Sequence, residues 1–268
     1  MNIVVCVKHV PDAQSDRTFN ESDNTTDRVG VDGLLSELDE YAVEAGLKLV
    51  ESASGEGEGA DESTVTVLTV GPDRAADAIK KSLQMGAHAG VHVNDEAIHG
   101  SDAVATSLIL AEAVKKIGRP DLVLTGMAST DAAMGVVPAM LAERLGLPQV
   151  TMASELTIDG GTVTIRRDGD VASETIVASL PALVSVTDQL NEPRYPSFKG
   201  IMAAKKKPVS TWSLVDLGLD AGSVGLAAAW TTVESFAKRP PRAKGQIVSD
   251  EGDGGTKLAQ FLSEHKFV

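Results

Sequence analysis

Residues 121–146 read DLVLTGMASTDAAMGVVPAMLAERLG, and their pattern gives the clearest indication of the fold. Its first six residues form a short apolar run that is typical of a buried strand. Apolar residues then recur at helical spacing over residues 132–145, and Gly146 supplies a helix C-cap. Small and polar residues fill the junction between the two segments. The stretch therefore predicts a strand, a loop and a helix in direct succession.

The same succession recurs upstream. Strands are predicted at residues 2–7 (NIVVCV), 64–70 (TVTVLTV) and 91–93 (VHV), and helices at residues 38–50, 74–85 and 101–117. Strands that alternate with helices of this length are joined by crossover connections, which make neighbouring strands parallel and place helices on both faces of the sheet. The first half of the chain therefore predicts a doubly wound α/β fold with a mostly parallel sheet.

The pattern changes after Pro148. Residues 155–166 (ELTIDGGTVTIR) predict a β-hairpin that turns at Asp159-Gly160-Gly161. Residues 173–179 and 182–186 predict two further strands with no helix between them. These strands indicate an antiparallel hairpin edge on the parallel sheet.

The remainder of the chain is less regular. Residues 191–208 show no regular period, and residues 209–268 are weakly patterned, with a predicted amphipathic helix at residues 256–265. We expect an α/β domain over residues 1–208 and an extended C-terminal tail over residues 209–268 that packs on a partner.

The chain has 268 residues, with 24 Lys and Arg against 38 Asp and Glu, which gives a formal net charge of −14. That balance disfavours sequence-independent binding to nucleic acid, which needs clustered basic residues. The single cysteine, Cys6, excludes a disulfide framework and a multi-cysteine zinc or iron–sulfur site, so we expect no metal. No apolar run approaches the ~20 residues that span a bilayer, and no signal peptide is visible. We therefore expect a cytoplasmic protein.

Most sequence signatures of enzymes are absent. The chain has neither the GxxxxGKS/T loop of nucleoside triphosphatases nor the GxSxG elbow of serine hydrolases. The Gly55-x-Gly57-x-x-Ala60 spacing matches a relaxed dinucleotide fingerprint, but it precedes a predicted strand instead of following one. Cys6 is interpreted as a small buried hydrophobic residue and not as a nucleophile. We therefore predict no catalytic residue.

The loop within the opening stretch is the first candidate site. In a doubly wound sheet, ligands bind beyond the carboxyl ends of strands, near the point at which strand order reverses. The loop leaves such an end and carries Gly126, Ser129, Thr130, Asp131 and Gly135 directly before a helix. Small residues let backbone N–H groups approach a phosphate, and a helix N-terminus contributes about half a positive charge. A plain strand–helix loop with an N-cap accounts for the pattern equally well.

Residues 190–208 (LNEPRYPSFKGIMAAKKKP), which we name the docking segment, are the second candidate site. They hold two of the nine aromatic residues of the chain, three prolines and five basic residues in an otherwise acidic protein. An aromatic side chain on such a loop either packs against the core or meets a partner. The pattern leaves both interpretations open.

Five stretches of the chain carry a family resemblance. They are VVCVKHVPD (residues 4–12), SELDEYAVEAGLKL (36–49), VGP (70–72), TGMASTD (125–131) and LPALVSVTDQLNEPRYPSFKGIMAAKKKP (180–208). In this order they resemble the beta subunit of electron transfer flavoproteins. The likeness extends from residue 1 to about residue 208 and is looser in the tail.

The resemblance implies an adenine nucleotide hydrolase-like, Rossmann-like fold that carries no chemistry alone. Such a subunit holds AMP as a structural ligand and forms an obligate heterodimer with an alpha subunit, which binds the redox-active FAD. The heterodimer takes electrons from flavoprotein dehydrogenases, such as the acyl-CoA dehydrogenases of fatty acid beta-oxidation. It passes them to a membrane-bound quinone oxidoreductase of the respiratory chain. We therefore expect a non-catalytic electron-transfer subunit.

Two alternatives remain open. In electron-bifurcating relatives the same pocket holds a second FAD that reacts with NADH, which would make the protein an enzyme. The apolar residues 132–137 argue against this, because they offer few side chains to a pyrophosphate or an isoalloxazine ring. An ATP-consuming adenine nucleotide hydrolase of similar fold is more distant. That class needs a phosphate loop after the first strand, and residues 6–12 (CVKHVPD) do not supply one.

The resemblance also implies which residues contact AMP. They lie at the ends of the first and second strands, at the start of the first helix and along the loop after the fourth strand: Cys6, Ser36, Glu37, Leu38, Asp39, Val70, Gly126, Met127, Ala128, Ser129, Thr130, Asp131, Ala132, Ala133, Met134, Gly135, Val136 and Val137. The chain departs from the family at Ser36-Glu37-Leu38, which replaces a frequent Asn-Pro-Phe. Residues 132–137 also lack the Asp, Thr and Gln side chains of many members. Phosphate contacts would then depend on backbone N–H groups and on the hydroxyls of Ser129 and Thr130, with few cations nearby.

The docking segment matches the recognition loop of the family, which anchors the partner dehydrogenase. Phe198 takes the place of the apolar anchor, commonly a leucine, and Lys206 matches a family lysine. The residues that we expect to dock the partner are Asn191, Glu192, Pro193, Arg194, Tyr195, Phe198 and Lys206. Asp168 stands where the family carries an acid linked to movement of the flavin domain, and a solvated hairpin charge is an equally good interpretation.

Overall fold

The computed structural model describes residues 1–15, 17–53, 63–242, 244–245 and 247–268. The Gly55-x-Gly57-x-x-Ala60 spacing lies outside the described residues. Packing contacts divide the chain into two compact units, Met1–Glu234 and Ser235–Val268. The first unit contains the sheet and both candidate sites.

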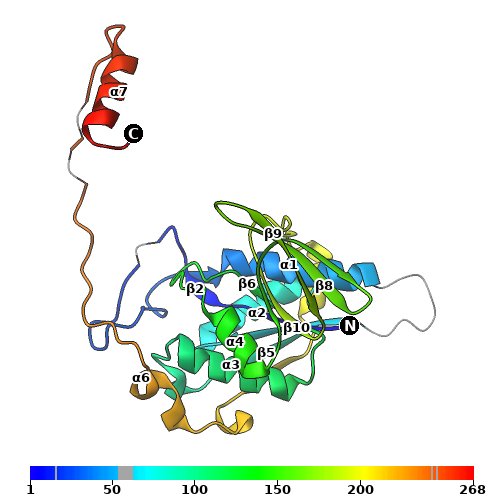
Figure 1. Ribbon diagram of the computed structural model, residues 1–268. Helices are drawn as coiled ribbons and strands as arrows, with labels where there is room; N and C mark the ends of the chain where they lie inside the picture. The colour runs from blue at the N-terminus through cyan, green and yellow to red at the C-terminus, as the bar shows by residue number, and fades with distance from the viewer. Residues whose placement is uncertain (16, 54–62, 243, 246) are drawn as a thin grey trace. The chain divides into compact units, whose positions relative to one another are not determined.

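A nine-stranded sheet forms the centre of the first unit in the described part of the chain (Figure 1). From β11 to β7 neighbouring strands pair in parallel, and β7, β8 and β9 pair antiparallel. This confirms the predicted α/β fold with a mostly parallel sheet and an antiparallel hairpin edge. In spatial order the strands are β11 (Val209–Trp212), β5 (Ala89–Val93), β4 (Thr64–Val70), β1 (Asn2–Cys6), β6 (Leu122–Gly126), β10 (Ala182–Val186), β7 (Gln149–Asp159), β8 (Thr162–Asp168) and β9 (Ser173–Ser179).

Helices cover both faces of the sheet. In β1, Ile3 and Val5 pack on the same side as α1 and α2, whereas Val4 and Cys6 pack on the side of α3 and α4. Successive side chains of a strand point to opposite faces, so a strand buried on both faces needs a continuous apolar run. The helices on the two faces are α1 (Glu37–Ala53), α2 (Ala76–Met85), α3 (Ala103–Ile117) and α4 (Val137–Leu145), with short helices η1 (Asp73–Ala75) and η2 (Glu96–Ile98) between them in the chain.

The strand order reverses at β1. The chain runs from β1 through α1 to β4 and then to β5, which lie on one side of β1, and it returns through α3 to β6 on the other side. Connections therefore diverge beyond the carboxyl ends of β1 and β6. This is the switch point at which open α/β sheets bind their ligands.

Helix α4 begins at Val137 and not at residue 132 as predicted. Pro138 fits only in the first turn of a helix, because it lacks an N–H group and its ring clashes with a preceding turn. Ala133 and Gly135 also take positive φ values of 52° and 67°, which no α-helix contains. Residues 132–136 therefore belong to the loop of the first candidate site.

The prediction that residues 191–208 are irregular is wrong, because they contain the short helix α5 (Phe198–Ala204). The Ser197 side chain caps α5 by accepting a hydrogen bond from the backbone N–H of Gly200 at 3.0 Å. The same glycine lies so close to α2 that an added Cβ would be 2.5 Å from the carbonyl oxygen of Gln84. Tertiary contacts with α2 thus stabilise helix α5. A helix of only seven residues is too short for its periodicity to be recognised in the sequence.

Two further strands lie outside the main sheet. β2 (His9–Pro11) and β3 (Gly33–Leu35) pair antiparallel directly after β1 and directly before α1. The polar chain between them therefore leaves and returns at the carboxyl edge of the main sheet. This arrangement brings its basic residues near the first candidate site.

The start of the expected C-terminal tail packs within the first unit. β11 extends the sheet beside β5, and Leu214 and Val224 are each only 1% exposed. The division at residues 208 and 209, and the packing of the tail on a partner, stay predictions. The remaining elements of the first unit are α5, η3 (Val215–Leu217), η4 (Ala221–Ser223) and α6 (Gly225–Ala228), and the second unit contains α7 (Gly254–Glu264).

Candidate functional site

The first candidate site forms where β1 and β6 end and α1 begins. Asp39, in the first turn of α1, accepts a hydrogen bond from the backbone N–H of Lys8 at 2.8 Å and another from the backbone N–H of Gly126. These bonds tie the start of α1 to both strand ends. A Cβ on Gly126 would lie 2.5 Å from Asp39 Oδ1 and 2.8 Å from Leu38 O, so this close approach requires glycine.

Burial controls the charge of two side chains at these strand ends. Asp39 is 7% exposed, and its burial raises its pKa to about 7 against the opposing effect of its N–H donors and of the Lys8 ammonium. Burial, together with the Asp39 carboxylate, raises the pKa of Cys6 to about 12. Cys6 is therefore a neutral thiol at physiological pH, as its interpretation as a small buried residue requires.

The loop after β6 leads into an uncapped helix. The Thr130 N–H donates to Ser36 Oγ at 3.4 Å, and the Ala133 N–H donates to Ser129 O at 2.9 Å. Val136 occupies the N-cap position of α4, and no side chain in the described residues caps that helix end. The first N–H groups of a helix have no partner within the helix, so this end can accept an anion.

Three basic side chains converge on this loop. Lys8 Nζ lies 2.9 Å from Asp131 Oδ1, and Arg28 Nη2 lies 2.6 Å from Asp131 Oδ2. Arg17 donates to the carbonyl oxygens of Thr130 at 2.7 Å and Asp131 at 3.0 Å. The prediction of few cations near the loop is therefore wrong.

Sequence reasoning missed Arg17 and Arg28 because they lie about a hundred positions before the loop. The β2–β3 pair, which folds the intervening chain back to the sheet edge, brings them there. Lys8 directly follows the strand predicted at residues 2–7, so its position in the sequence already indicates that it lies near the site.

The ion pairs fix the charge state of Asp131. Its side chain is 3% exposed, and burial alone would raise its pKa, but the Lys8 and Arg28 charges outweigh burial and hold that pKa well below its usual range. Burial lowers the pKa of Lys8, and Asp131 opposes that change. Lys8 and Arg28 thus pair with the ionised Asp131 carboxylate, while Arg17 binds backbone carbonyl oxygens of the loop, so basic side chains gather at this loop in a chain of net charge −14.

The structure brings most of the predicted AMP-contacting residues to one edge of the sheet. Cys6 and Gly126 end adjacent strands, and Val70 ends β4, which pairs with β1 on its other side. Ser36 and Asp39 are buried, whereas residues 132–135 are exposed. Contact of these residues with AMP stays a prediction.

The docking segment presents exposed apolar side chains. Tyr195 is 91% exposed and Phe198, the first residue of α5, is 80% exposed. Lys206 is also exposed, whereas Lys207 donates to carbonyl oxygens at the end of α2. Arg194, expected to dock a partner, is instead paired with Glu44 and Glu51 of α1. Phe198 therefore does not pack against the core, which was one of the two interpretations that the sequence leaves open.

Asp168 lies in a local hydrogen-bond network at the end of β8. It accepts from Ser154 Oγ at 2.6 Å and from Arg166 Nε at 2.8 Å, and also from the Ser173 hydroxyl. These donors lower the pKa of Asp168 to about 2. Asp168 is therefore ionised and held in place, and its link to movement of a flavin domain stays a prediction.

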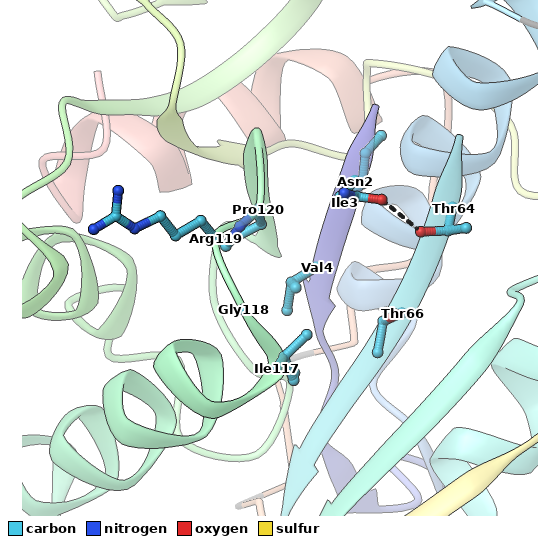
Figure 2. A pocket seen from close by; sticks show the side chains of 9 residues that line it. All are labelled: Asn2, Ile3, Val4, Thr64, Thr66, Ile117, Gly118, Arg119 and Pro120. Carbon is cyan, nitrogen blue, oxygen red and sulfur yellow. Dashed lines mark hydrogen bonds between the residues drawn. The ribbon is translucent and has the colours of Figure 1, made fainter. Parts of the chain in front are cut away.

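A separate hollow of about 240 Å³ lies at the opposite edge of the sheet (Figure 2). Asn2 and Thr64, whose side chains share a hydrogen bond of 3.0 Å, stand at the amino ends of β1 and β4, and Arg119 lines the hollow nearby. Amino ends are not where this fold class binds ligands. The hollow is therefore not part of the candidate site.

The residues that the structure describes contain neither a metal-binding cluster nor a membrane-spanning helix. They include no group of three or more His, Cys, Asp or Glu side chains placed to hold a metal ion. None of the helices in the described ranges is long and apolar enough to cross a bilayer.

The chain is similar to known proteins along nearly its whole length. Residues 23–217 match the electron transfer flavoprotein domain family. The chain is 45% identical over 267 residues to the electron transfer flavoprotein subunit beta of Mycobacterium tuberculosis (strain H37Rv), covering 100% of this chain and 99% of the relative. It is 31% identical over 270 residues to the subunit beta of Megasphaera elsdenii, covering 98% and 97%. It is 33% identical over 249 residues to subunit CarD of the caffeyl-CoA reductase–Etf complex of Acetobacterium woodii, covering 93% and 92%.

Proposed function

The chain belongs to the electron transfer flavoprotein family as a beta subunit, an electron-carrier component, and from this premise we propose that it binds AMP as a structural ligand. The AMP site is the carboxyl edge at β1 and β6, and the redox-active FAD is bound by the alpha subunit of an obligate heterodimer. The chain itself supplies no catalytic group, and the heterodimer works in the cytoplasm.

The convergence of Lys8, Arg17 and Arg28 on the loop before the uncapped end of α4 carries this proposal. A helix N-terminus with unpaired N–H groups favours an anion, and nearby cations add to that preference. Gly126 lets the start of α1 pack directly against the end of β6, which places Ser36 and Asp39 beside the loop. The residues present therefore fit a nucleotide phosphate.

The choice of AMP over a second FAD rests on residues 132–137. Their side chains are all apolar or absent, so they offer backbone N–H groups but no side-chain donor. A single phosphate needs fewer donors than the pyrophosphate and isoalloxazine ring of FAD. The alternative is an FAD-binding subunit of an electron-bifurcating complex that oxidises NADH.

The docking segment supports the second half of the proposal, which concerns partners. Phe198 and Tyr195 are exposed, and so are Lys199 and Lys206 of the same segment, which agrees with an aromatic anchor and a charged rim. We assign this surface to flavoprotein dehydrogenases such as acyl-CoA dehydrogenases. The Acetobacterium relative is named for a complex with a caffeyl-CoA reductase, which supports a partner that acts on a CoA thioester. Electrons then pass to a membrane-bound quinone oxidoreductase.

The nucleotide part of the proposal is tested by mass spectrometry of nucleotides released by heat from the purified heterodimer. We expect AMP in an amount equal to that of the beta subunit. ATP, or FAD in twofold amount with no AMP, would overturn the assignment.

A matched pair of arginine variants tests the role of the cations. Arg28→Gln should lower the AMP content, because it removes a charge beside the loop, while leaving the FAD of the alpha subunit in place. Arg119→Gln, at the opposite edge of the sheet, is the control and should retain AMP. Equal AMP content in both variants would show that the arginine only anchors Asp131.

A further inference from the structure

Hydrogen bonds attach the docking segment to helices of the first unit both before and after its aromatic residues. Before them, Asn191 Nδ2 donates to the Tyr41 carbonyl oxygen at 3.0 Å. After them, Lys207 Nζ donates to the carbonyl oxygens of Leu83 and Gly86, each at 3.0 Å. The exposed aromatic stretch therefore lies between an attachment to α1 and an attachment to the end of α2.

Arg194 adds an attachment at the start of that stretch. Its Nε and Nη2 groups donate to the two carboxylate oxygens of Glu44 at 2.7 and 3.1 Å. Nη2 also donates to Glu51 Oε2 at 2.9 Å, and Nη1 donates to Glu51 Oε1. The backbone N–H of Arg194 donates to Glu44 Oε2 at 3.3 Å. Both its side chain and its backbone are thus fixed to one helix.

The burial of these groups shows which way the guanidinium faces. The Glu44 side chain is 3% exposed and that of Arg194 is 32% exposed. The hydrogen bonds to Glu51 and Glu44 raise the pKa of Arg194, so the guanidinium stays charged. A planar guanidinium holds carboxylates in a fixed geometry that an ammonium group does not reproduce. Lys48, at 3.7 Å from Glu44 and half-exposed, is no substitute for it.

The residues that follow Arg194 face solvent. Tyr195 is 91% exposed, Phe198 is 80% exposed, and Pro193 and Pro196 restrict the backbone around Tyr195. A segment that is already held in one conformation loses less conformational freedom when it binds, which increases affinity without any new contact.

We propose that Arg194 is a positioning residue, which clamps the docking segment to Glu44 and Glu51 of α1 so that Tyr195 and Phe198 are presented in one arrangement, and that it makes no direct contact with the partner. This inference rests on the proposed docking function. It replaces the expectation that Arg194 itself binds the dehydrogenase.

The test uses the heterodimer with an acyl-CoA dehydrogenase and its acyl-CoA substrate, and it follows reduction of the carrier flavin. Arg194→Lys keeps the positive charge but loses the paired N–H donors of the planar guanidinium. Glu51→Gln keeps the size of the side chain but loses its negative charge. Both should raise the KM for the carrier severalfold and leave kcat unchanged. The double variant should raise the KM little more than either single variant does, because both substitutions break the same clamp.

Two readouts separate positioning from contact. Amide hydrogen exchange over residues 195–204 should accelerate in Arg194→Lys and Glu51→Gln and stay unchanged elsewhere. In Arg194→Lys, which keeps the charge, the dependence of KM on ionic strength should match that of the unmodified protein, since no partner contact is lost. Lys199→Gln, which removes an exposed rim charge, should instead change the ionic-strength dependence without changing exchange. Glu112→Gln, in the exposed ion pair of α3, is the neutral control.

Different measurements would overturn the positioning role of Arg194 and the docking function of the segment. Unchanged exchange in Arg194→Lys, or a raised KM with an altered ionic-strength dependence, would overturn the positioning role. An unchanged KM in Phe198→Ala would overturn the docking function instead, whatever the exchange data show for Arg194.

Discussion

The candidate site has no room for a side chain at Gly126. A methyl group there would meet Asp39 Oδ1 at 2.5 Å and the backbone of Leu38 at 2.8 Å, and backbone cannot move as a flexible side chain does. Such overpacking typically costs about 1–3 kcal/mol. Gly126→Ala should therefore lower the free energy of unfolding by roughly that amount and reduce nucleotide retention, measured by denaturant titration and by nucleotide release. Gly255→Ala, where an added Cβ meets nothing within 4 Å, is the control and should lose no stability. Equal behaviour of the two variants would contradict the close approach.

Asp39 gives the site a pH dependence whose sign follows from its raised pKa. In the folded chain its pKa is about 7, and its usual value is 3.8. Between these values the folded state holds a proton that the unfolded state has released, so the contribution of Asp39 to stability falls as pH rises toward 7. Asp39→Asn should flatten this dependence. The free energy of unfolding, measured at about pH 5 and about pH 8, should fall less in the variant. Parallel losses in both proteins would show that Asp39 titrates normally.

The elements differ in how far the sequence predicts them, for physical reasons. The parallel strands are buried on both faces, so each appears as a continuous apolar run, as residues 2–7 do. The sequence pattern predicts the start of α4 too early, because Ala133 adopts a positive φ that its residue type disfavours. Helix α5 and the β2–β3 pair depend on tertiary contacts, as at Gly200 against Gln84. Arg28 meets Asp131 only through the fold, so no local pattern near the loop indicates it.

Helix α5 places Phe198 at its first turn, exposed and held by the Ser197 cap. A docking anchor of this kind is typically worth about 2 kcal/mol or more, which corresponds to a change of roughly thirtyfold. Phe198→Ala should therefore weaken dehydrogenase-driven flavin reduction by that order, and Phe198→Leu should recover most of it. A small-molecule reductant should reduce the flavin equally in all forms. Val171→Ala, at a side chain that is 99% exposed on the hairpin edge, is the matched control. Unchanged coupling in Phe198→Ala would show that this surface binds no dehydrogenase.

Within the first unit, α1 connects the two candidate sites. Its first turn carries Asp39 at the switch point, and its later turns carry Glu44 and Glu51 beneath the docking segment. A single helix thus contacts both the loop after β6 and the docking segment. Both parts of the proposed function, AMP binding and docking of a dehydrogenase, therefore depend on the placement of this helix.

The number of flavins in each heterodimer, measured by absorbance after release from the denatured protein, is the decisive measurement for the proposed nucleotide site. We expect one FAD, which belongs to the alpha subunit, together with one AMP from the site at β1 and β6. Two FAD molecules and no AMP would contradict it, because the site formed by Lys8, Arg28 and the loop after β6 would then hold a redox cofactor and the chain would take part in the chemistry.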